Sequence, residues 1–261
     1  MKRFENKIVA ITGSARGIGL ECAKRFSKEG ARVAIIDINF EAAQNAAELV
    51  KHKTGNQVHG FSSDISNLDS VKDTFKKISD EMGAPQIFVN CAAITDDKLF
   101  LDSKPADWNK IISVDLFGAL NCVHTFLPSM VANQFGRIIC LASDSARIGQ
   151  ARLSYYAAAK AGVIALVKSI AQEVGRSGVT LNIVSPGATN TEMRIDREQN
   201  LLAQMGPEKY ERRQKTVLKM YPMGRVGNPE DIAASILFLS SDDASWVTGQ
   251  VLSVNGGFCM P

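Results

Sequence analysis

Tyr156 and Lys160 are the residues of this sequence whose types and spacing most directly suggest chemistry. They stand four apart in a run with good helix propensity, so both side chains are expected on one helical face, one turn apart. A phenol ionises near pH 10, and a neighbouring ammonium favours the phenolate, which brings the pKa of Tyr156 closer to that of a working acid or base. The pair alone also fits an ordinary solvated helix face.

Ser143 lies thirteen residues before Tyr156 and follows an apolar run, 137–142, that is typical of a buried strand. Its hydroxyl can point into the same space as the phenol and hydrogen-bond a substrate oxygen. Ser145, two residues further on, is a second hydroxyl beside that space. We therefore predict that Ser143, Ser145 and Tyr156 face the substrate.

The composition is that of an ordinary globular protein, with 45% hydrophobic and 22% charged residues among 261. A net charge of +3, with scattered Lys and Arg, gives no indication of nucleic-acid binding. The five cysteines lack the spacing of a metal site, and most sit in apolar runs, so we expect no bound metal and a cytoplasmic protein. No signal peptide precedes the first predicted strand, and no apolar run approaches the roughly 20 residues of a membrane-spanning helix.

Short β-branched runs alternate with helical patterns along the whole chain. This rhythm predicts a single α/β domain over 1–261, a Rossmann fold with a doubly wound, seven-stranded parallel sheet and helices on both faces. A longer polar stretch, about 188–226, breaks the alternation and is expected to be a substrate lid. Ser66 is the expected N-cap of the third helix. The strands are expected at 7–12, 31–37, 57–61, 86–90, 137–142, 179–184 and 250–254, and the helices at 18–29, 41–51, 67–82, 106–132, 154–174 and 231–240.

A glycine-rich turn joins the first strand to the first helix, the context that a dinucleotide-binding turn requires. Gly13, Gly17 and Gly19 allow the backbone to approach a pyrophosphate, and the helix N-terminus offers free N–H groups. The spacing G-x-x-x-G-x-G meets the usual G-x-G-x-x-G pattern only approximately. Asp37 ends the second strand, where an acidic residue typically accepts the hydroxyls of an adenosine ribose. A plain glycine turn with an acidic strand end is the alternative.

At this point the sequence resembles the short-chain dehydrogenase/reductase family over nearly its whole length. The resemblance rests on the turn from Thr12 to Gly19 and on a set of further motifs in the family's order and spacing. These are Asp64-Ile65, Asn90-Cys-Ala-Ala93, Ser143, Tyr156-Ala-Ala-Ala-Lys160, Pro186-Gly187 and Thr191-Glu-Met193. The resemblance implies a homotetrameric Rossmann-fold oxidoreductase with a nicotinamide cofactor and a small-molecule alcohol or ketone substrate.

The resemblance also implies individual roles. Tyr156 would be the acid/base, Ser143 would orient the carbonyl or alcohol, and Lys160 would hold the nicotinamide ribose. Asp64 and Ile65 would hold the adenine, Asn90 would border the cofactor, and the carboxamide would lie near Thr189 and Thr191. The complete set expected at the cofactor is Gly13, Ser14, Arg16, Gly17, Ile18, Gly19, Asp37, Asp64, Ile65, Asn90, Ala92, Tyr156, Lys160, Pro186, Thr189 and Thr191.

Two positions depart from the family pattern. The family usually has N-N-A-G after the fourth strand, whereas this chain ends the motif with Ala93. Where the family carries the Asn that completes a catalytic tetrad, this chain has Asp115. We retain Asp115 as a fourth catalytic candidate and expect an ionised carboxylate there to raise the pKa of Tyr156.

The predicted function is an NAD-dependent oxidoreductase that interconverts a secondary alcohol and a ketone by hydride transfer. Asp37 favours NAD, although Arg16 is a residue type that often meets the 2′-phosphate of NADP. The substrate stays open between a polyol or cyclic alcohol and a 3-oxoacyl thioester, and Arg147 and Arg152 could meet an acidic group or simply be solvated. A cofactor-binding regulatory protein without turnover is the alternative from another class.

Overall fold

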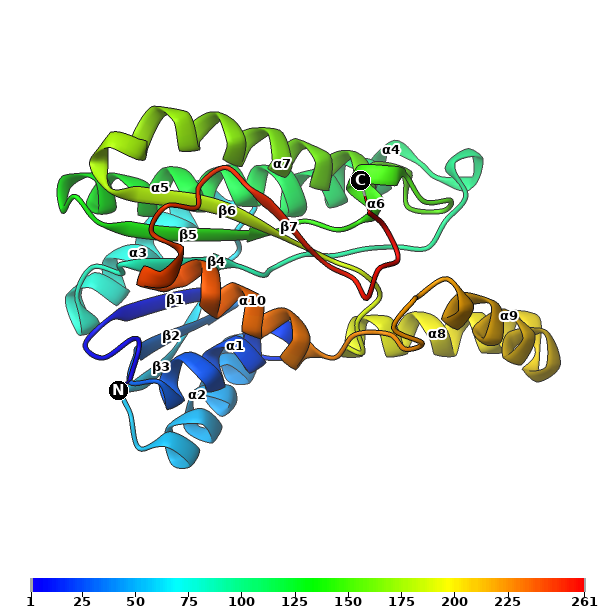
Figure 1. Ribbon diagram of the computed structural model, residues 1–261, viewed down its shortest axis with the longest axis horizontal. Coiled ribbons are helices and arrows are strands. Elements are labelled where there is room, and N and C mark those ends of the chain that lie inside the picture. Colours follow the sequence, from blue (N-terminus) through cyan, green and yellow to red (C-terminus); the bar gives the residue numbers. More distant parts are fainter. Residues whose placement is uncertain (1, 261) are drawn as a thin grey trace.

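The strand–helix alternation of the sequence forms a seven-stranded, all-parallel sheet in the computed structural model, which describes residues 2–260 (Figure 1). The strand order is β3-β2-β1-β4-β5-β6-β7, so the chain winds outward in both directions from a switch point between β1 and β4. The predicted doubly wound Rossmann fold is confirmed. The strands are β1 (Ile8–Thr12), β2 (Arg32–Asp37), β3 (Val58–Ser62), β4 (Ile87–Asn90), β5 (Gly136–Leu141), β6 (Val179–Pro186) and β7 (Val251–Val254).

Helices cover both faces of the sheet (Figure 1). The apolar side chains of α1, α2 and α10 pack on one face, and those of α3, α5 and α7 on the other, which gives two cores separated by the sheet. The helices are α1 (Gly17–Lys28), α2 (Phe40–Thr54), α3 (Leu68–Met82), α4 (Pro105–Ile112), α5 (Gly118–Ala132), α6 (Ser145–Ile148), α7 (Ser154–Val174), α8 (Glu192–Met205), α9 (Pro207–Lys219) and α10 (Pro229–Ser240), with 3₁₀ turns η1 (Phe100–Asp102), η3 (Gly175–Ser177) and η4 (Asp242–Ala244).

The long helix expected over 106–132 is interrupted by a π-helical turn, η2 (Ser113–Phe117), between α4 and α5. Such turns are frequent at functional sites because the wider turn changes where side chains point. By length and composition alone, Pro105–Ala132 could cross a membrane. Its buried residues Ala119, Val123 and Phe126 pack into the core beneath the sheet, as in a core helix.

One further expectation, the N-cap of α3, needs correction. The N-cap of α3 is Asn67 rather than Ser66, because the Asn67 side chain accepts from the backbone N–H of Asp69 and Ser70, while the Ser66 hydroxyl donates to Asp64. The stretch 188–226 is largely helical, since it contains α8 and α9, which extend to one side of the sheet (Figure 1). Thr191 caps α8 through its side chain, a helix start that the polar composition concealed.

Candidate active site

Ser143, Tyr156 and Lys160 lie together at the carboxyl edge of the sheet, as predicted. Ser143 follows β5, and the other two side chains project from α7, which packs against β5 and β6. Lys160 is almost completely buried, and its ammonium donates to the Leu141 carbonyl at 3.3 Å. The same Nζ lies 5.7 Å from the centre of the Tyr156 ring. The helical spacing therefore sets a lysine beside a phenol, which is the arrangement that acid/base chemistry requires.

Ser145 lies behind Ser143. Its hydroxyl is buried and donates to Ser143 Oγ at 2.9 Å, and its backbone N–H approaches the same atom at 3.3 Å. These two contacts orient the Ser143 hydroxyl. Ser145, which was predicted to contact the substrate, thus instead orients the Ser143 hydroxyl.

Asp115 comes to the same site from the π-helical turn. Its Oδ1 accepts the backbone N–H of Ile94 at 2.9 Å, and its Oδ2 lies 3.6 Å from Lys160 Nζ and has no hydrogen-bond partner within residues 2–260. Both side chains of this ion pair are at most 2% exposed. The family's Asn position therefore carries a buried carboxylate in direct electrostatic contact with the lysine.

The charges at the site act on one another. Burial raises the pKa of Tyr156, the Asp115 carboxylate raises it further, and together they outweigh the Lys160 ammonium and the Ser143 hydroxyl, which lower it. The expected effects of Lys160 and Asp115 are thus joined by burial, which has the largest effect on the pKa of Tyr156. For Lys160, burial opposes the charge, but Asp115 and the phenol raise the pKa overall. Burial raises the pKa of Asp115 despite the opposing pull of Lys160.

Replacing Asp115 with Asn is expected to shift the acidic limb of alcohol oxidation to lower pH. Oxidation needs the phenolate, the Asp115 charge raises the pKa of Tyr156, and removing that charge lowers it. The amide oxygen can still accept the Ile94 N–H, so activity should be kept or increased. The pH profile of kcat/KM for the native chain and Asp115→Asn measures the shift. An unmoved limb would rule out the electrostatic coupling.

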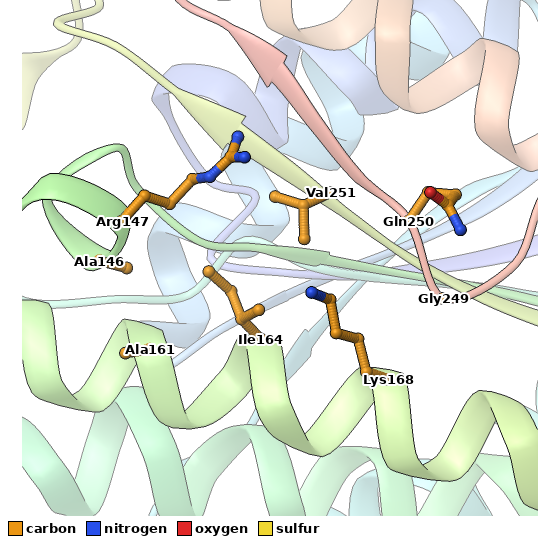
Figure 2. Close-up of a pocket in the computed structure, with 8 residues that line it drawn as sticks. All are labelled: Ala146, Arg147, Ala161, Ile164, Lys168, Gly249, Gln250 and Val251. Carbon is orange, nitrogen blue, oxygen red and sulfur yellow. The ribbon is translucent and has the colours of Figure 1, made fainter. Parts of the chain in front are cut away.

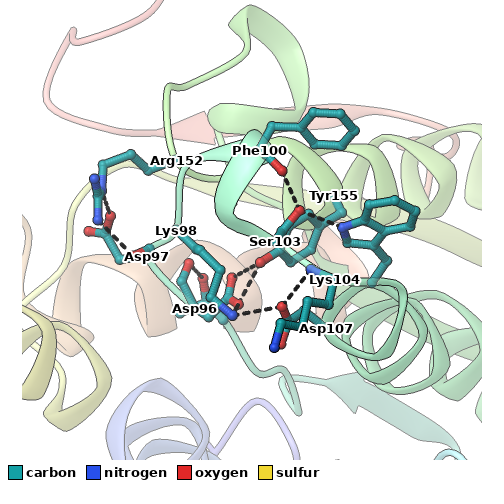
Figure 3. A network of polar contacts seen from close by, with 11 residues as sticks. Asp96, Asp97, Lys98, Phe100, Ser103, Lys104, Asp107, Arg152 and Tyr155 are labelled. Carbon is teal, nitrogen blue, oxygen red and sulfur yellow. Dashed lines mark hydrogen bonds and ion pairs between the residues drawn. The ribbon is translucent and has the colours of Figure 1, made fainter.

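Tyr155, the residue beside Tyr156, points in another direction. It is buried, and its hydroxyl donates to the Asp96 carboxylate at 2.5 Å within the polar network of Figure 3. Burial and the Asp96 charge both raise the pKa of Tyr155 far above its ordinary value. Because the Tyr155 hydroxyl is hydrogen-bonded to Asp96 in the loop after β4, it is poorly suited to proton transfer.

Tyr155→Phe is expected to cost stability and to leave catalysis nearly intact. A hydrogen bond to a charged acceptor contributes about 1.5–3 kcal/mol, and the partial exposure of Asp96 reduces this to about 1–2 kcal/mol. Urea unfolding measures the loss, and kcat is expected to stay within about twofold because the phenol lies outside the Tyr156–Lys160 pair. A large loss of kcat with unchanged stability would contradict this assignment.

The glycine-rich turn after β1 is closely packed at two of its glycines. A Cβ on Gly13 would lie 2.6 Å from Ala92 Cα, and one on Gly19 would lie 2.4 Å from the Gly13 carbonyl, so both positions exclude any side chain. Helix α1 begins here without a side-chain cap and without an acidic residue in its first turn, whereas α2 and α3 are capped by Asn39 and Asn67. Its free N–H groups fit a pyrophosphate.

The residues around this turn divide into exposed groups and internal supports. Asp37 ends β2, and its Oδ2 accepts the Ala15 N–H at 3.3 Å, so the carboxylate stands beside the turn. The Ser14 hydroxyl turns inward to the Ile11 carbonyl, which leaves only its backbone for a cofactor. Asn90 is likewise turned inward and accepts from the Thr12 hydroxyl at 2.7 Å.

The other predicted cofactor residues line the same edge. Pro186 ends β6, Thr189 is buried just beyond it, and Thr191 begins α8. The absent Cβ of Gly17 faces Thr191 and Glu192, which brings the start of α8 against the turn. Of the remaining predicted residues, Arg16 lies in the turn and Ile18 in α1. Ile65 follows β3 and Ala92 follows β4. The Asp64 side chain, also after β3, accepts the Ser66 N–H.

Two cavities flank these residues. One of about 460 Å³ lies between the loop after β4 and α8, and Arg16, Asp97, Arg152 and Met193 are among its lining residues. The other, of about 600 Å³, lies between α7 and β7, and Figure 2 shows Arg147, Lys168 and Val251 around it. Arg147 donates to the Ser253 hydroxyl and Arg152 to Asp97. Neither arginine is therefore the simple solvated charge that we considered.

Three acidic residues that support the site, Asp96, Asp97 and Asp144, were not predicted from the sequence. Asp144, between the two serines, is buried and accepts from Ser185 at 2.9 Å and from Asn255 at 2.7 Å, which ties the Ser143 loop to β6 and to the C-terminal segment. Burial raises its pKa despite these two donors. Asp96 and Asp97 anchor the loop after β4, and their adjacency in the sequence was the available signal.

The known proteins that this chain resembles are reductases and dehydrogenases. A family model described as enoyl-(acyl carrier protein) reductase matches residues 13–259. The chain is 37% identical over 252 residues to a 3-oxoacyl-[acyl-carrier-protein] reductase of Chlamydia trachomatis, with 97% of each covered. It is also 37% identical over 254 residues to a (2S)-[(R)-hydroxy(phenyl)methyl]succinyl-CoA dehydrogenase subunit of Thauera aromatica, again with 97% of each covered.

A solved structure of levodione reductase superposes with a TM-score of 0.91 at 30% identity and covers 98% of each chain. These matches extend over the sheet, the glycine-rich turn and the Tyr156–Lys160 helix together. The chain therefore belongs to the short-chain dehydrogenase/reductase family, and it is an oxidoreductase acting on CH–OH groups.

Proposed function

We propose that this protein is an NAD-dependent oxidoreductase that interconverts a secondary alcohol and a ketone, with Tyr156 as the acid/base. The observation that carries the proposal is the meeting of a phenol, a buried lysine and an oriented serine hydroxyl beside a dinucleotide-type turn. The intact Ser143, Tyr156 and Lys160 favour turnover over a purely regulatory role.

The cofactor would lie across the carboxyl edge of the sheet. The open N-terminus of α1 suits the pyrophosphate, Asp37 suits the adenosine ribose, and Asp64 with Ile65 suits the adenine. Thr189 and Thr191 would lie near the carboxamide, and Lys160 near the second ribose. When bound, the nicotinamide supplies hydride transfer.

The proton chemistry belongs to the chain itself. In oxidation the Tyr156 phenolate would take the hydroxyl proton of the alcohol, and in reduction the phenol would return it to the ketone oxygen. Ser143 would donate a hydrogen bond to the same oxygen, since Ser145 already orients its hydroxyl. Lys160 would favour the phenolate, and Asp115 would hold Lys160 charged and moderate that effect.

The segment 188–226 is proposed to be the substrate lid. Its helix α8 lines the cavity of about 460 Å³ with Met193 and Leu201, which offer apolar contacts. A cyclic or otherwise apolar alcohol fits such a wall. The second candidate substrate is a 3-oxoacyl thioester, which is favoured by relatives named as 3-oxoacyl-[acyl-carrier-protein] reductases at 34–37% identity.

A turnover panel tests the proposal and separates the two substrate classes. The panel contains cyclic diketones, secondary alcohols and acetoacetyl-CoA, each with NAD(H) and NADP(H), and nicotinamide absorbance is followed. Turnover of the cyclic compounds alone would identify a small-molecule dehydrogenase, and turnover of acetoacetyl-CoA alone a thioester reductase. Cofactor binding without turnover of any compound in the panel would instead favour the alternative, a cofactor-binding regulatory protein.

We further propose a homotetramer in the cytoplasm. Edge strand β7 is only half-buried, and Trp246, Phe238 and Met260 beside it are exposed, Trp246 to 98%. A second copy covering this edge would bury both the strand and these side chains. The five cysteines are free thiols, which suits a reducing compartment. Sedimentation equilibrium gives the number of copies.

A further inference from the structure

Asp97, in the loop after β4, holds two arginines that come from two other segments of the chain. Arg152, just before α7, donates through Nε to the Asp97 carboxylate and through Nη2 to the Asp97 carbonyl at 2.9 Å (Figure 3). Arg197, on α8, donates to the other carboxylate oxygen at 2.5 Å. Burial works to raise the pKa of Asp97, but the two guanidinium contacts lower it overall. The carboxylate therefore stays charged.

Arg152 is held in an unusual backbone conformation. Its φ of 72° lies in the left-handed region that non-glycine residues rarely adopt. Such strain persists only where surrounding contacts stabilise the conformation. Here the Lys98 N–H donates to the Arg152 carbonyl at 3.2 Å, and the Arg152 guanidinium donates to Asp97. Arg152 stands four residues before Tyr156, so this clamp fixes Asp97 to the start of the catalytic helix.

Arg197 joins α8 to that clamp. Within residues 2–260, its contact with Asp97 is the only ion pair between the α8–α9 segment and the rest of the chain. The other ion pairs of the segment are internal, chiefly on Glu198, which accepts from Arg213 at 2.8 Å. Helix α9 contains no buried residue. Besides the burial of Glu198 and Leu201, the position of α8 therefore depends on the Arg197 contact with the Asp97 carboxylate.

The cavity of about 460 Å³ lies beneath this contact, and Asp97, Arg152 and Arg197 all line it. Its floor includes Ala93 and Ile94, and the Ile94 N–H donates to Asp115, the partner of Lys160. Ser143, Tyr156 and Lys160 are not among the lining residues, so within residues 2–260 the cavity approaches the proposed proton-transfer site only through Ile94. Since α8 supplies Met193, Arg197 and Leu201 to the lining, a displacement of α8 changes this cavity.

We propose that Asp97 is a positioning residue for substrate binding: through Arg197 it seats α8 against the substrate cavity, while Arg152 keeps Asp97 in place. The proposal rests on the proposed function in one respect, namely that the alcohol or ketone occupies this cavity. The three side chains are 15–35% exposed, so salt screens the contact only in part. Its strength is consequently expected to fall as ionic strength rises.

The kinetic test uses Asp97→Asn, which keeps the shape and removes the charge, in the full-length chain with NADH. With whichever of acetoacetyl-CoA or a cyclic diketone is turned over, KM is expected to rise about tenfold while kcat stays within about twofold. The affinity for NADH is expected to fall less than that for the substrate, because the start of α8 lies against Gly17 whereas Asp97 contacts Arg197, farther along the helix. As the salt concentration rises, the KM of the native chain should increase toward the KM of Asp97→Asn. The KM of Asp97→Asn itself should not change with salt.

Three further variants control for folding and for charge. Arg197→Gln breaks the contact from the α8 side and should reproduce the KM effect, whereas Arg197→Lys keeps the charge and should retain much of the native KM. Arg212→Gln is the matched control, because it removes an exposed α9 arginine that pairs with no acid within residues 2–260. Equal KM values for the native chain, Asp97→Asn and Arg197→Gln would overturn the proposal.

Hydrogen exchange separates this proposal from the proposed function. The backbone amides of α8 are expected to exchange about tenfold faster in Asp97→Asn and Arg197→Gln than in the native chain, with Arg212→Gln unchanged. Faster exchange without turnover of any compound would support the role of Asp97 in seating α8 and would count against the enzymatic function alone. Unchanged exchange in α8 would overturn the proposal whether or not the chain is active.

Discussion

Replacing Tyr156 with Phe is expected to lower kcat for alcohol oxidation by about 10²- to 10⁴-fold, the range that a positioned general acid or base contributes. The ring that packs beside Ile94 and Ala159 remains, so the fold and the cavity should be unaffected. Only the hydroxyl that carries the proton is removed. Lys160 keeps its contacts to Asp115 and to the Leu141 carbonyl.

Three measurements define this result. Single-turnover rates report the chemical step, the quenching of intrinsic fluorescence reports NAD affinity, and urea unfolding reports stability. NAD affinity is expected to stay close to native. Tyr155→Phe is the matched control, since it removes a hydroxyl from the adjacent residue, whose partner is Asp96. If Tyr155→Phe abolishes turnover and Tyr156→Phe does not, the assignment of the acid/base residue is wrong.

The chain is expected to use NAD with a kcat/KM about 100-fold or more above that for NADP. Asp37 stands beside the turn that would hold the pyrophosphate, and a 2′-phosphate would bring two like charges together at a cost of several kcal/mol, each 1.4 kcal/mol being tenfold. Arg16 is the opposing influence. It is exposed and lines the cavity beside α8, so its guanidinium is not tied to Asp37.

Asp37→Asn tests this assignment of the ribose site. It removes the charge, so kcat/KM for NADP should rise and the preference for NAD should narrow by at least about tenfold. Asp69→Asn is the control, because it removes a carboxylate that is 89% exposed on α3. Equal kcat/KM values for the two cofactors in the native chain would contradict the role of Asp37.

Much of the fold was predictable because its signals are local. Buried parallel strands are short apolar runs, and all seven were predicted to within about two residues at each end. The Tyr156–Lys160 pair was equally accessible, since four residues on a helix define a common face. The choice between Ser66 and Asn67 as N-cap could not be predicted, because both residue types cap helices well. The outcome depends on the hydrogen bond that the Ser66 hydroxyl donates to Asp64.

The remaining features depend on contacts between distant segments. The bond between Asp97 and Arg197 spans 100 residues of sequence, and no periodicity reports it. Within 188–226, the alternating charges of 208–219 indicated the exposed helix α9, whereas α8 was not predicted because its composition is largely polar. Asp115 was expected at the site from the family resemblance, but the π-helical turn that carries it was not predicted, because a regular helix was the simpler expectation from propensity.

The π-helical turn has an evolutionary consequence for this chain. A π-turn contains one residue more than an α-turn, and each residue advances a helix by about 100°. Losing one residue there would restore regular hydrogen bonding but rotate one half of the helix relative to the other. Either Asp115 would leave Lys160, or Ile111 would leave Tyr155. In descendants of this sequence, the number of residues between Ser113 and Phe117 is therefore expected to stay constant.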